Sequence, residues 1–168
     1  MAIKDKVFKG KIKQVANFTF KEVYNFLYDY LADEGWEVHE SLYKEKSMGE
    51  GVKELNLMWS VSKDVSDYFK FEVSMFWIIL GMKDVKAVID GKEVKMQNGT
   101  LEINFDATLI KDHQNKWDSG LMKPIREIYD NYVIPGTIED YEVELFEKVN
   151  ELIATLKSYL AIEGQHQY

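Results

Sequence analysis

The chain contains no cysteine, and this absence excludes several kinds of chemistry together. Disulfide bridges, zinc ribbons, iron–sulfur clusters and thiol catalysis all depend on that residue. Histidine is scarce as well, and none of the three, His39, His113 and His166, stands three or four residues from another. Because two metal ligands on one helix face need that spacing, we expect no metal site and no cofactor.

Long apolar runs are also missing. The most apolar stretch, residues 73–80, has the length of a strand, whereas a membrane-spanning helix needs about 20 apolar residues. The first residues lack the apolar core of a signal peptide. We therefore expect a soluble, cytoplasmic protein without a membrane span, and the absence of cysteine fits a reducing compartment.

Basic charge is limited and unevenly placed. The formal net charge is −8, which argues against nucleic acid as a partner because phosphate binding depends on basic clusters. Residues 1–21 hold six lysines and one aspartate, a net +5, so the rest of the chain carries −13. Lys9, Lys11 and Lys13 fit the solvent face of an edge strand, where lysine discourages pairing with other chains. A basic arm for an anionic partner is the alternative.

The composition that remains is that of a single folded domain. The chain has 168 residues, of which 46% are hydrophobic and 14% aromatic, enough for a core without disulfide or metal support. We expect one α+β domain over residues 1–164 and a ragged tail over residues 165–168.

Alternation of apolar and polar residues dominates the middle of the chain. Leu55, Leu57 and Trp59 alternate with polar neighbours, and the same period of two returns between Leu101 and Leu109. This period predicts strands with one face on a core. Asp90-Gly91 and Asn98-Gly99 are typical of two-residue hairpin turns. Seven strands follow from this pattern. They cover residues 4–14, 36–46, 52–63, 68–80, 85–89, 92–97 and 100–111.

Helices are predicted on both sides of these strands. Thr19 and Glu22 have the spacing of a capping box, and Gly35 suits the end of the helix that they begin. A short helix is expected from Pro124 to residue 133, and Pro135-Gly136 should end it. Thr137 then caps a long C-terminal helix that reaches Gly164, with an apolar stripe along one side.

This order of elements resembles the helix-grip fold of the START and Bet v 1-like families. The resemblance implies a curved antiparallel sheet of about seven strands packed on the C-terminal helix, with a gap between them that often holds an apolar ligand. No sequence motif carries the likeness. Those families usually place two short helices after the first strand, where this chain has one, and the helix over residues 125–133 is additional. No residue role can therefore be transferred from them.

Several residues are candidates for a binding site. Four aromatic residues fall on strand or helix faces that we expect to be buried, where they line a pocket or form a packed core. They are Trp59, Trp77, Phe105 and Tyr141. Glu40 lies between Val38 and Leu42 on an apolar face, so we expect a buried carboxylate that acts as an acid or anchors a polar ligand atom. The alternatives are a bulge that turns Glu40 outward, or a lysine or arginine partner.

Other candidates concern assembly and surface charge. Phe76, Ile78 and Leu80 give the strand over residues 68–80 a second apolar face, which predicts a contact with another element or subunit. Arg126, the single arginine, stands near Glu127 and Asp130, where we expect ordinary surface ion pairs rather than a grip on a ligand carboxylate.

Two functions are consistent with these features. The first is a non-enzymatic binding module that holds an apolar small molecule or lipid between the sheet and the C-terminal helix. The alternative is a structural or assembly protein that forms a homo-oligomer through a strand edge and the second apolar sheet face. No catalytic motif favours an enzyme, and catalysis would require polar groups that converge on Glu40.

Overall fold

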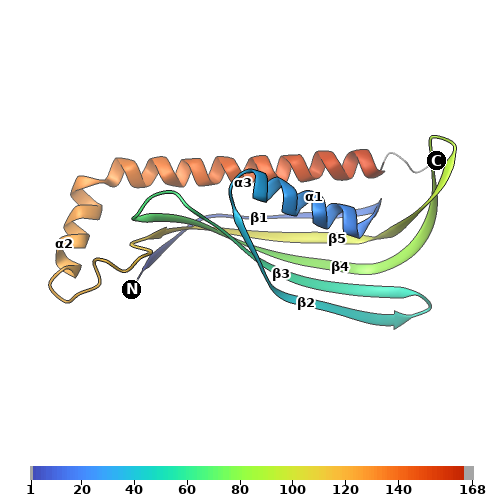
Figure 1. The fold of residues 1–168 in the computed structure, drawn as a ribbon, viewed down its shortest axis with the longest axis horizontal. Helices are drawn as coiled ribbons and strands as arrows, with labels where there is room; N and C mark the ends of the chain where they lie inside the picture. Colours follow the sequence, from blue (N-terminus) through green and yellow to red (C-terminus); the bar gives the residue numbers. More distant parts are fainter. Residues whose placement is uncertain (1, 165–168) are drawn as a thin grey trace.

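The computed structural model describes residues 2–164 and shows an α+β protein built on one antiparallel sheet (Figure 1). Its five strands are ordered β1-β5-β4-β3-β2. The elements are β1 (Ile3–Phe18), α1 (Phe20–Asp33), β2 (Glu37–Gly49), β3 (Val52–Asp64), β4 (Phe69–Ile89), β5 (Lys92–Lys111), α2 (Lys123–Ile128), a π-helical turn (Tyr129–Val133) and α3 (Pro135–Gly164). The predicted tail over residues 165–168 lies outside the described residues.

The sheet has five strands rather than the seven predicted from the sequence. Asp90-Gly91 does form a turn, but Asn98-Gly99 lies inside β5 and Gly81 lies inside β4. A Cβ at Gly99 would stand 3.0 Å from the carbonyl oxygen of Leu80, so glycine allows two backbones to approach closely. The register of β4 and β5 shifts at this point, between Leu80 and Lys83. The glycines therefore mark a bulge where both strands bend, as Figure 1 shows.

The two faces of the sheet differ in what covers them. The inner face, which carries Leu57, Trp59 and Trp77, packs against α1 and α3 and forms the core. The outer face carries the alternate residues, among them Met58 and Phe76, which are half-buried and do not belong to this core. The predicted alternation is confirmed, since the inner-face residues are buried and their neighbours are not.

The first helix begins and ends where the sequence predicts, but it is capped differently. Thr19 is the N-cap, yet its side chain makes no capping hydrogen bond, so the expected capping box is not formed. The backbone N–H of Phe20 instead donates to Oε1 of Gln97, at 3.0 Å. Gly35 follows the helix with a φ of 79°, a left-handed conformation that suits glycine. A side chain from β5 therefore helps to fix the position of α1 on the sheet.

The C-terminal helix spans 30 residues, or about 45 Å at 1.5 Å per residue. It begins at Pro135, so the expectation that Thr137 caps the helix is wrong, whereas the short helical segment before it ends at Val133, ahead of Pro135-Gly136 as predicted. Proline is favoured in a first helical turn because its missing N–H has no partner there in any case. The buried stripe of α3 consists of Leu145, Val149, Leu152, Ile153, Leu156 and Leu160. Burying each such side chain is worth about 1.5–3 kcal/mol, which holds α3 on the sheet.

A buried polar cluster joins the segment around α2 to the end of the sheet. Arg126 is 7% exposed and its guanidinium lies 3.3 Å from a carboxylate oxygen of Asp112, which is 1% exposed. The expectation of surface ion pairs for Arg126 is therefore wrong. Nearby, the Tyr68 hydroxyl donates to Asp130 at 2.6 Å, and Lys111 lies 2.9 Å from Asp5. The aromatic ring of Trp117 stacks on Tyr129 next to these residues.

Within residues 2–164, no helix is long and apolar enough to cross a membrane. The same part of the chain contains no group of three or more histidine, aspartate or glutamate side chains arranged to hold a metal ion.

Candidate functional site

The space between the helices and the sheet is almost filled by side chains. A hollow there, lined by residues such as Leu31, Trp36 and Leu152, has a volume of about 10 Å³. One water molecule needs about 10–15 Å³, and ligand pockets usually reach about 300 Å³ or more. The predicted pocket residues Trp59, Trp77 and Phe105 are 0%, 0% and 1% exposed and do not line this hollow. They lie in packed core.

The predicted pocket residues are only partly brought together. Tyr141 on α3 packs against Phe69 and Phe71, with ring centroids 4.7 and 6.1 Å apart. Trp59 and Trp77 instead stand side by side, 4.8 Å between centroids. Glu40 joins this second group. The structure thus assembles three of the candidates, Glu40, Trp59 and Trp77, and places Tyr141 in another part of the core.

Glu40 accepts two hydrogen bonds on a single oxygen. The hydroxyl of Tyr24, on α1, donates to Oε2 at 3.0 Å, and the indole Nε1 of Trp59, on β3, donates to the same atom at 3.1 Å. Trp59 lies directly across from Glu40 in the pairing of β2 and β3. The carboxylate is thereby held between a helix and a strand.

The location of Glu40 differs from the sequence-based expectation in one respect. Glu40 lies on the inner face, as predicted, but its side chain is exposed rather than buried. The register of β2 and β3 shifts immediately afterwards, between Glu40 and Leu42. This bulge places Leu42 opposite Met58 on the outer face, and every residue from Ser41 to Gly49 is exposed. The inner side of β2 is therefore open to solvent beside Glu40.

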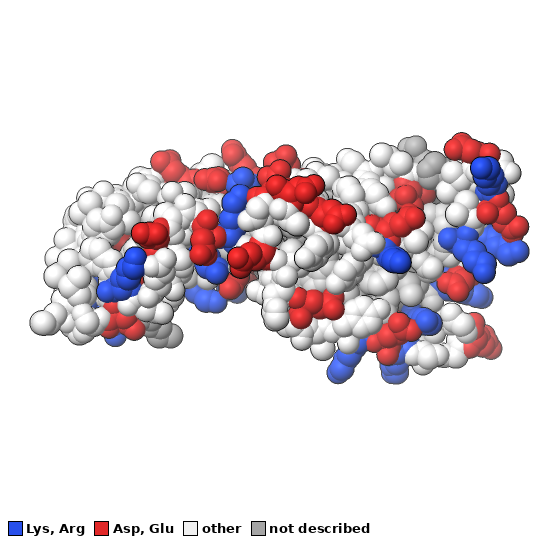
Figure 2. All heavy atoms as spheres, viewed as in Figure 1, with Lys and Arg blue, Asp and Glu red and all other residues white. Residues whose placement is uncertain are grey.

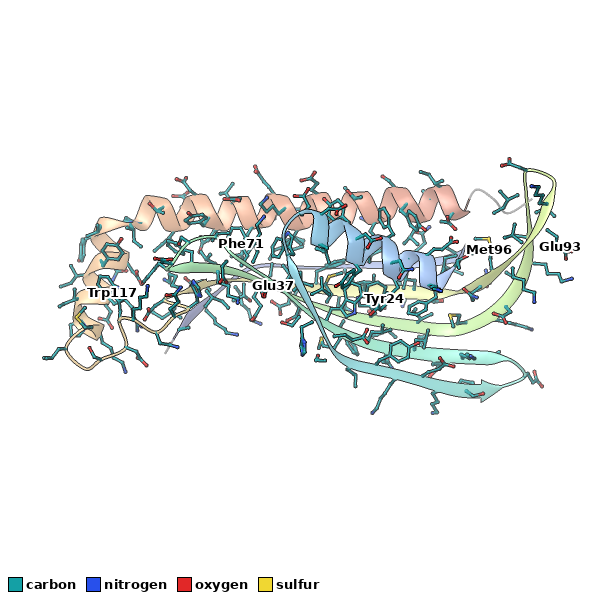
Figure 3. All side chains as sticks on the ribbon, viewed as in Figure 1. Tyr24, Glu37, Phe71, Glu93, Met96 and Trp117 are labelled. Atoms are coloured by element: carbon teal, nitrogen blue, oxygen red, sulfur yellow. The ribbon has the colours of Figure 1, made fainter. Side chains whose placement is uncertain are left out.

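Aromatic rings surround the buried side of this carboxylate. Tyr24 and Tyr28, four residues apart on α1, both meet the Trp59 ring edge to face, at 4.9 and 6.4 Å between centroids. Edge-to-face pairs of this kind stabilise by about 0.5–1.5 kcal/mol beyond the area that they bury. Figure 3 shows Tyr24 between α1 and the strands. We call Tyr24, Tyr28, Glu40, Tyr43 and Trp59 the Glu40 site.

Two of the tyrosines in the Glu40 site are accessible to a ligand. Tyr28 and Tyr43 are 45% and 47% exposed, whereas Trp59 is fully buried. Trp59 therefore supports the carboxylate from inside, and the two tyrosines provide the ring surface near the solvent. Sequence reasoning missed all three tyrosines of the site. The spacing of Tyr24 and Tyr28, one helical turn apart beside the apolar stripe of α1, is the signal that points to them.

The electrostatics of the Glu40 site raise the pKa of two of its phenols, those of Tyr24 and Tyr43. Burial, then the hydrogen bond and the charge of Glu40, raise the pKa of Tyr24 to about 12. Burial, then the charges of Glu45 and Glu40, also raise the pKa of Tyr43. Tyr24 therefore remains a hydrogen-bond donor at neutral pH, and the site presents one negative charge framed by uncharged rings.

A separate hollow lies on the outer face of the sheet. Its volume is about 350 Å³, and its lining includes Met58, Phe76, Lys9 and Asp106. The predicted interface residues Phe76, Ile78 and Leu80 lie on this face. Phe76 and Ile78 are half-buried, and Leu80 is 44% exposed.

Comparison with known proteins adds no assignment. No protein-family model matches the chain, and no curated protein matches it.

Proposed function

We propose that this protein is a non-enzymatic binding module whose ligand contacts the Glu40 site. The predicted location, between the sheet and α3, offers a hollow of only about 10 Å³. The observation that carries the proposal is the convergence of Tyr24 and Trp59 on one oxygen of an exposed carboxylate. Two hydrogen bonds hold Glu40 in one orientation before any ligand arrives, which lowers the ordering cost of binding.

The surroundings of Glu40 support binding rather than catalysis. Ligand sites are mostly apolar with a few fixed polar groups, and the rings of Tyr28 and Tyr43 beside one carboxylate have that character. General acid catalysis at neutral pH favours groups whose pKa lies near 7. Tyr24, with its pKa raised to about 12, does not meet that requirement.

Native mass spectrometry of the protein purified from its own host tests this function. We expect the wild-type chain to retain a small molecule that the Glu40→Gln variant loses. Glu45→Gln is the matched control, because Glu45 is on the same strand and pairs with Lys53 at 2.7 Å. A ligand retained equally by Glu40→Gln, or a wild-type chain without any ligand, would contradict the proposal.

A second function is favoured by the outer face of the sheet. The outer face offers a hollow of about 350 Å³ beside Met58 and Phe76, and β2 is an exposed edge strand of the same sheet, so another copy of the chain has both a surface and a strand edge to contact. The charges are complementary for head-to-tail contact. Lys9, Lys11 and Lys13 are exposed on β1, and acidic side chains gather along α3 (Figure 2).

Light scattering after size-exclusion chromatography tests self-association. We expect oligomers whose population rises with protein concentration and that Phe76→Lys abolishes. Val143→Lys adds a positive charge at an exposed position of α3, so it should weaken the oligomer if β1 of one copy contacts α3 of the next. A wild-type monomer at all concentrations would rule this second function out.

A further inference from the structure

The charge of Glu40 is not matched by a cation of the protein. Its two hydrogen-bond donors, a phenol and an indole, are both neutral. Within residues 2–164, Glu40 forms no ion pair, whereas its neighbour Glu45 pairs with Lys53 at 2.7 Å and Glu72 pairs with Lys4 at 3.0 Å. The negative charge of Glu40 is therefore available to a ligand that brings its own positive charge.

The rings beside Glu40 are suited to the same kind of ligand. A cation over the face of an aromatic ring is attracted by the ring quadrupole, and organic ammonium groups are commonly recognised in this way. Tyr28 on α1 packs edge to face on the Trp59 ring, whose indole donates to Glu40. Tyr43 on β2 lies on the same inner face as Glu40, since it pairs with Leu57 as Glu40 pairs with Trp59. Each of the two tyrosines keeps nearly half of its surface exposed. The fully buried Trp59 takes no part in direct contact and acts as a positioning residue for Glu40.

From these features we propose that the Glu40 site binds an organic ammonium group, with Glu40 as its counter-ion and the tyrosine rings at its flanks. This inference rests on the proposed binding function and names its ligand class. The open inner side of β2 leaves room for a larger molecule that carries the ammonium group at one end.

Other ligand classes fit these residues less well. An anion would be repelled by the negative charge of Glu40. Divalent metal ions such as calcium require several oxygen ligands, and Glu40 supplies one carboxylate. A neutral apolar ligand would form no favourable contact with the Glu40 carboxylate, and it would remove water from that charged group without replacing it. A diffuse organic cation uses both the charge and the rings.

Nuclear magnetic resonance titration with choline chloride tests the ligand class. The indole N–H signal of Trp59, identified by its loss in Trp59→Phe, reports directly on the hydrogen bond to Glu40. The matched probe is 3,3-dimethyl-1-butanol, which has the shape of choline but no charge. Sodium chloride at equal ionic strength controls for screening. We expect saturable shifts with choline and binding of the alcohol that is at least about tenfold weaker.

Three variants of the full chain link the binding to the named groups. Glu40→Gln keeps an acceptor for Tyr24 and Trp59 but removes the charge, so choline affinity should fall about fivefold or more while the alcohol is unaffected. Tyr43→Leu should weaken choline about two- to fivefold, the size of an exposed cation–π contact. Glu45→Gln should change choline affinity less than twofold.

Three outcomes of the choline titration would contradict the proposed ammonium site. Equal affinity for choline and the alcohol would show that charge is not recognised, and choline binding unchanged in Glu40→Gln would place the cation elsewhere. If choline does not bind at all, the ammonium class is wrong. The proposed function then stands or falls separately, according to whether the host-derived ligand is lost in Glu40→Gln.

Discussion

At the scale of single residues, the Glu40 site shows how one exposed carboxylate supports a buried indole. The Trp59 side chain has no exposed surface, and its N–H finds a partner only because Glu40 lies at the solvent edge. The adjacent indole of Trp77 has a buried Nε1 without a hydrogen-bond partner among residues 2–164. An unpaired buried donor costs about 1–3 kcal/mol, so the hydrogen bond from Trp59 contributes to stability as well as to the shape of the site.

Two substitutions of Glu40 separate these contributions. Glu40→Leu removes the acceptor and leaves the Trp59 N–H unpaired, so we expect the free energy of unfolding to fall by about 1–3 kcal/mol. Glu40→Gln preserves an acceptor oxygen and should cost less than about 1 kcal/mol. Urea denaturation followed by tryptophan fluorescence measures both, and equal losses for the two variants would show that the hydrogen bond does not matter.

Alkaline pH provides a second test at this scale. The pKa of Tyr24 is raised from 10.0 to about 12 in the folded chain. Between these values the unfolded chain releases the proton and the folded chain retains it, so stability that is complete below pH 10 is lost as the pH rises toward 12. The urea concentration at the unfolding midpoint should fall as the pH is raised from 9 to 11.5. This fall should be less steep in Tyr24→Phe than in the wild-type chain. A decline of the same slope in Tyr24→Phe would mean that this hydroxyl does not contribute.

At the scale of elements, glycines shape the sheet in a way that the sequence pattern does not distinguish from turns. Asn98-Gly99 has the composition of a hairpin, but the Asn98 side-chain amide donates to Asn17 at 2.7 Å and Gly99 faces the backbone of β4. Long-range pairing therefore overrides the local turn preference. The hydrophobic alternation predicts the buried face of β3 correctly, because it depends on burial rather than on the connections. In β2 it fails after Glu40, where a bulge moves Leu42 to the outer face.

Gly99→Ala tests the close approach of β4 and β5. Its Cβ would lie 3.0 Å from the Leu80 oxygen and 3.1 Å from the Met82 Cα, both backbone atoms that cannot move away alone. We expect a loss of about 1–3 kcal/mol in unfolding free energy. Gly120→Ala, where no atom lies within 4 Å of the new Cβ, should stay within about 0.5 kcal/mol. Thermal melts of the two variants make the comparison, and similar melting temperatures would refute it.

The contact between α2 and the sheet includes a buried ion pair, Arg126 with Asp112, that the sequence pattern does not predict. Because Asp112 and Arg126 are far apart in the chain and each has nearer partners of opposite charge, only the fold brings them together. Removing one member of a buried pair costs about 3–5 kcal/mol, so Arg126→Ala should be strongly destabilising. Adding Asp112→Asn should recover part of that loss in a double-mutant cycle of urea denaturation. Additive losses would show that the pair is not coupled.

At the scale of the whole molecule, sequence reasoning anticipates the α+β class, the helix after the first strand and the long C-terminal helix. The strand count is wrong for the reason found at Gly99. The likeness to helix-grip proteins stays a prediction. Of the candidate site, Glu40 and Trp59 were accessible from the alternation of β2 and β3. The tyrosines were missed, because the helical spacing of Tyr24 and Tyr28 does not show that α1 lies over β3 beside Glu40.

The most direct test of where a ligand binds is a crystal structure of the protein purified from its own host. We expect density for a bound group within about 3 Å of the Glu40 carboxylate, with side chains filling the space between α3 and the sheet. Density for a ligand between α3 and the sheet, with the Trp59 indole turned away from Glu40, would contradict the proposal.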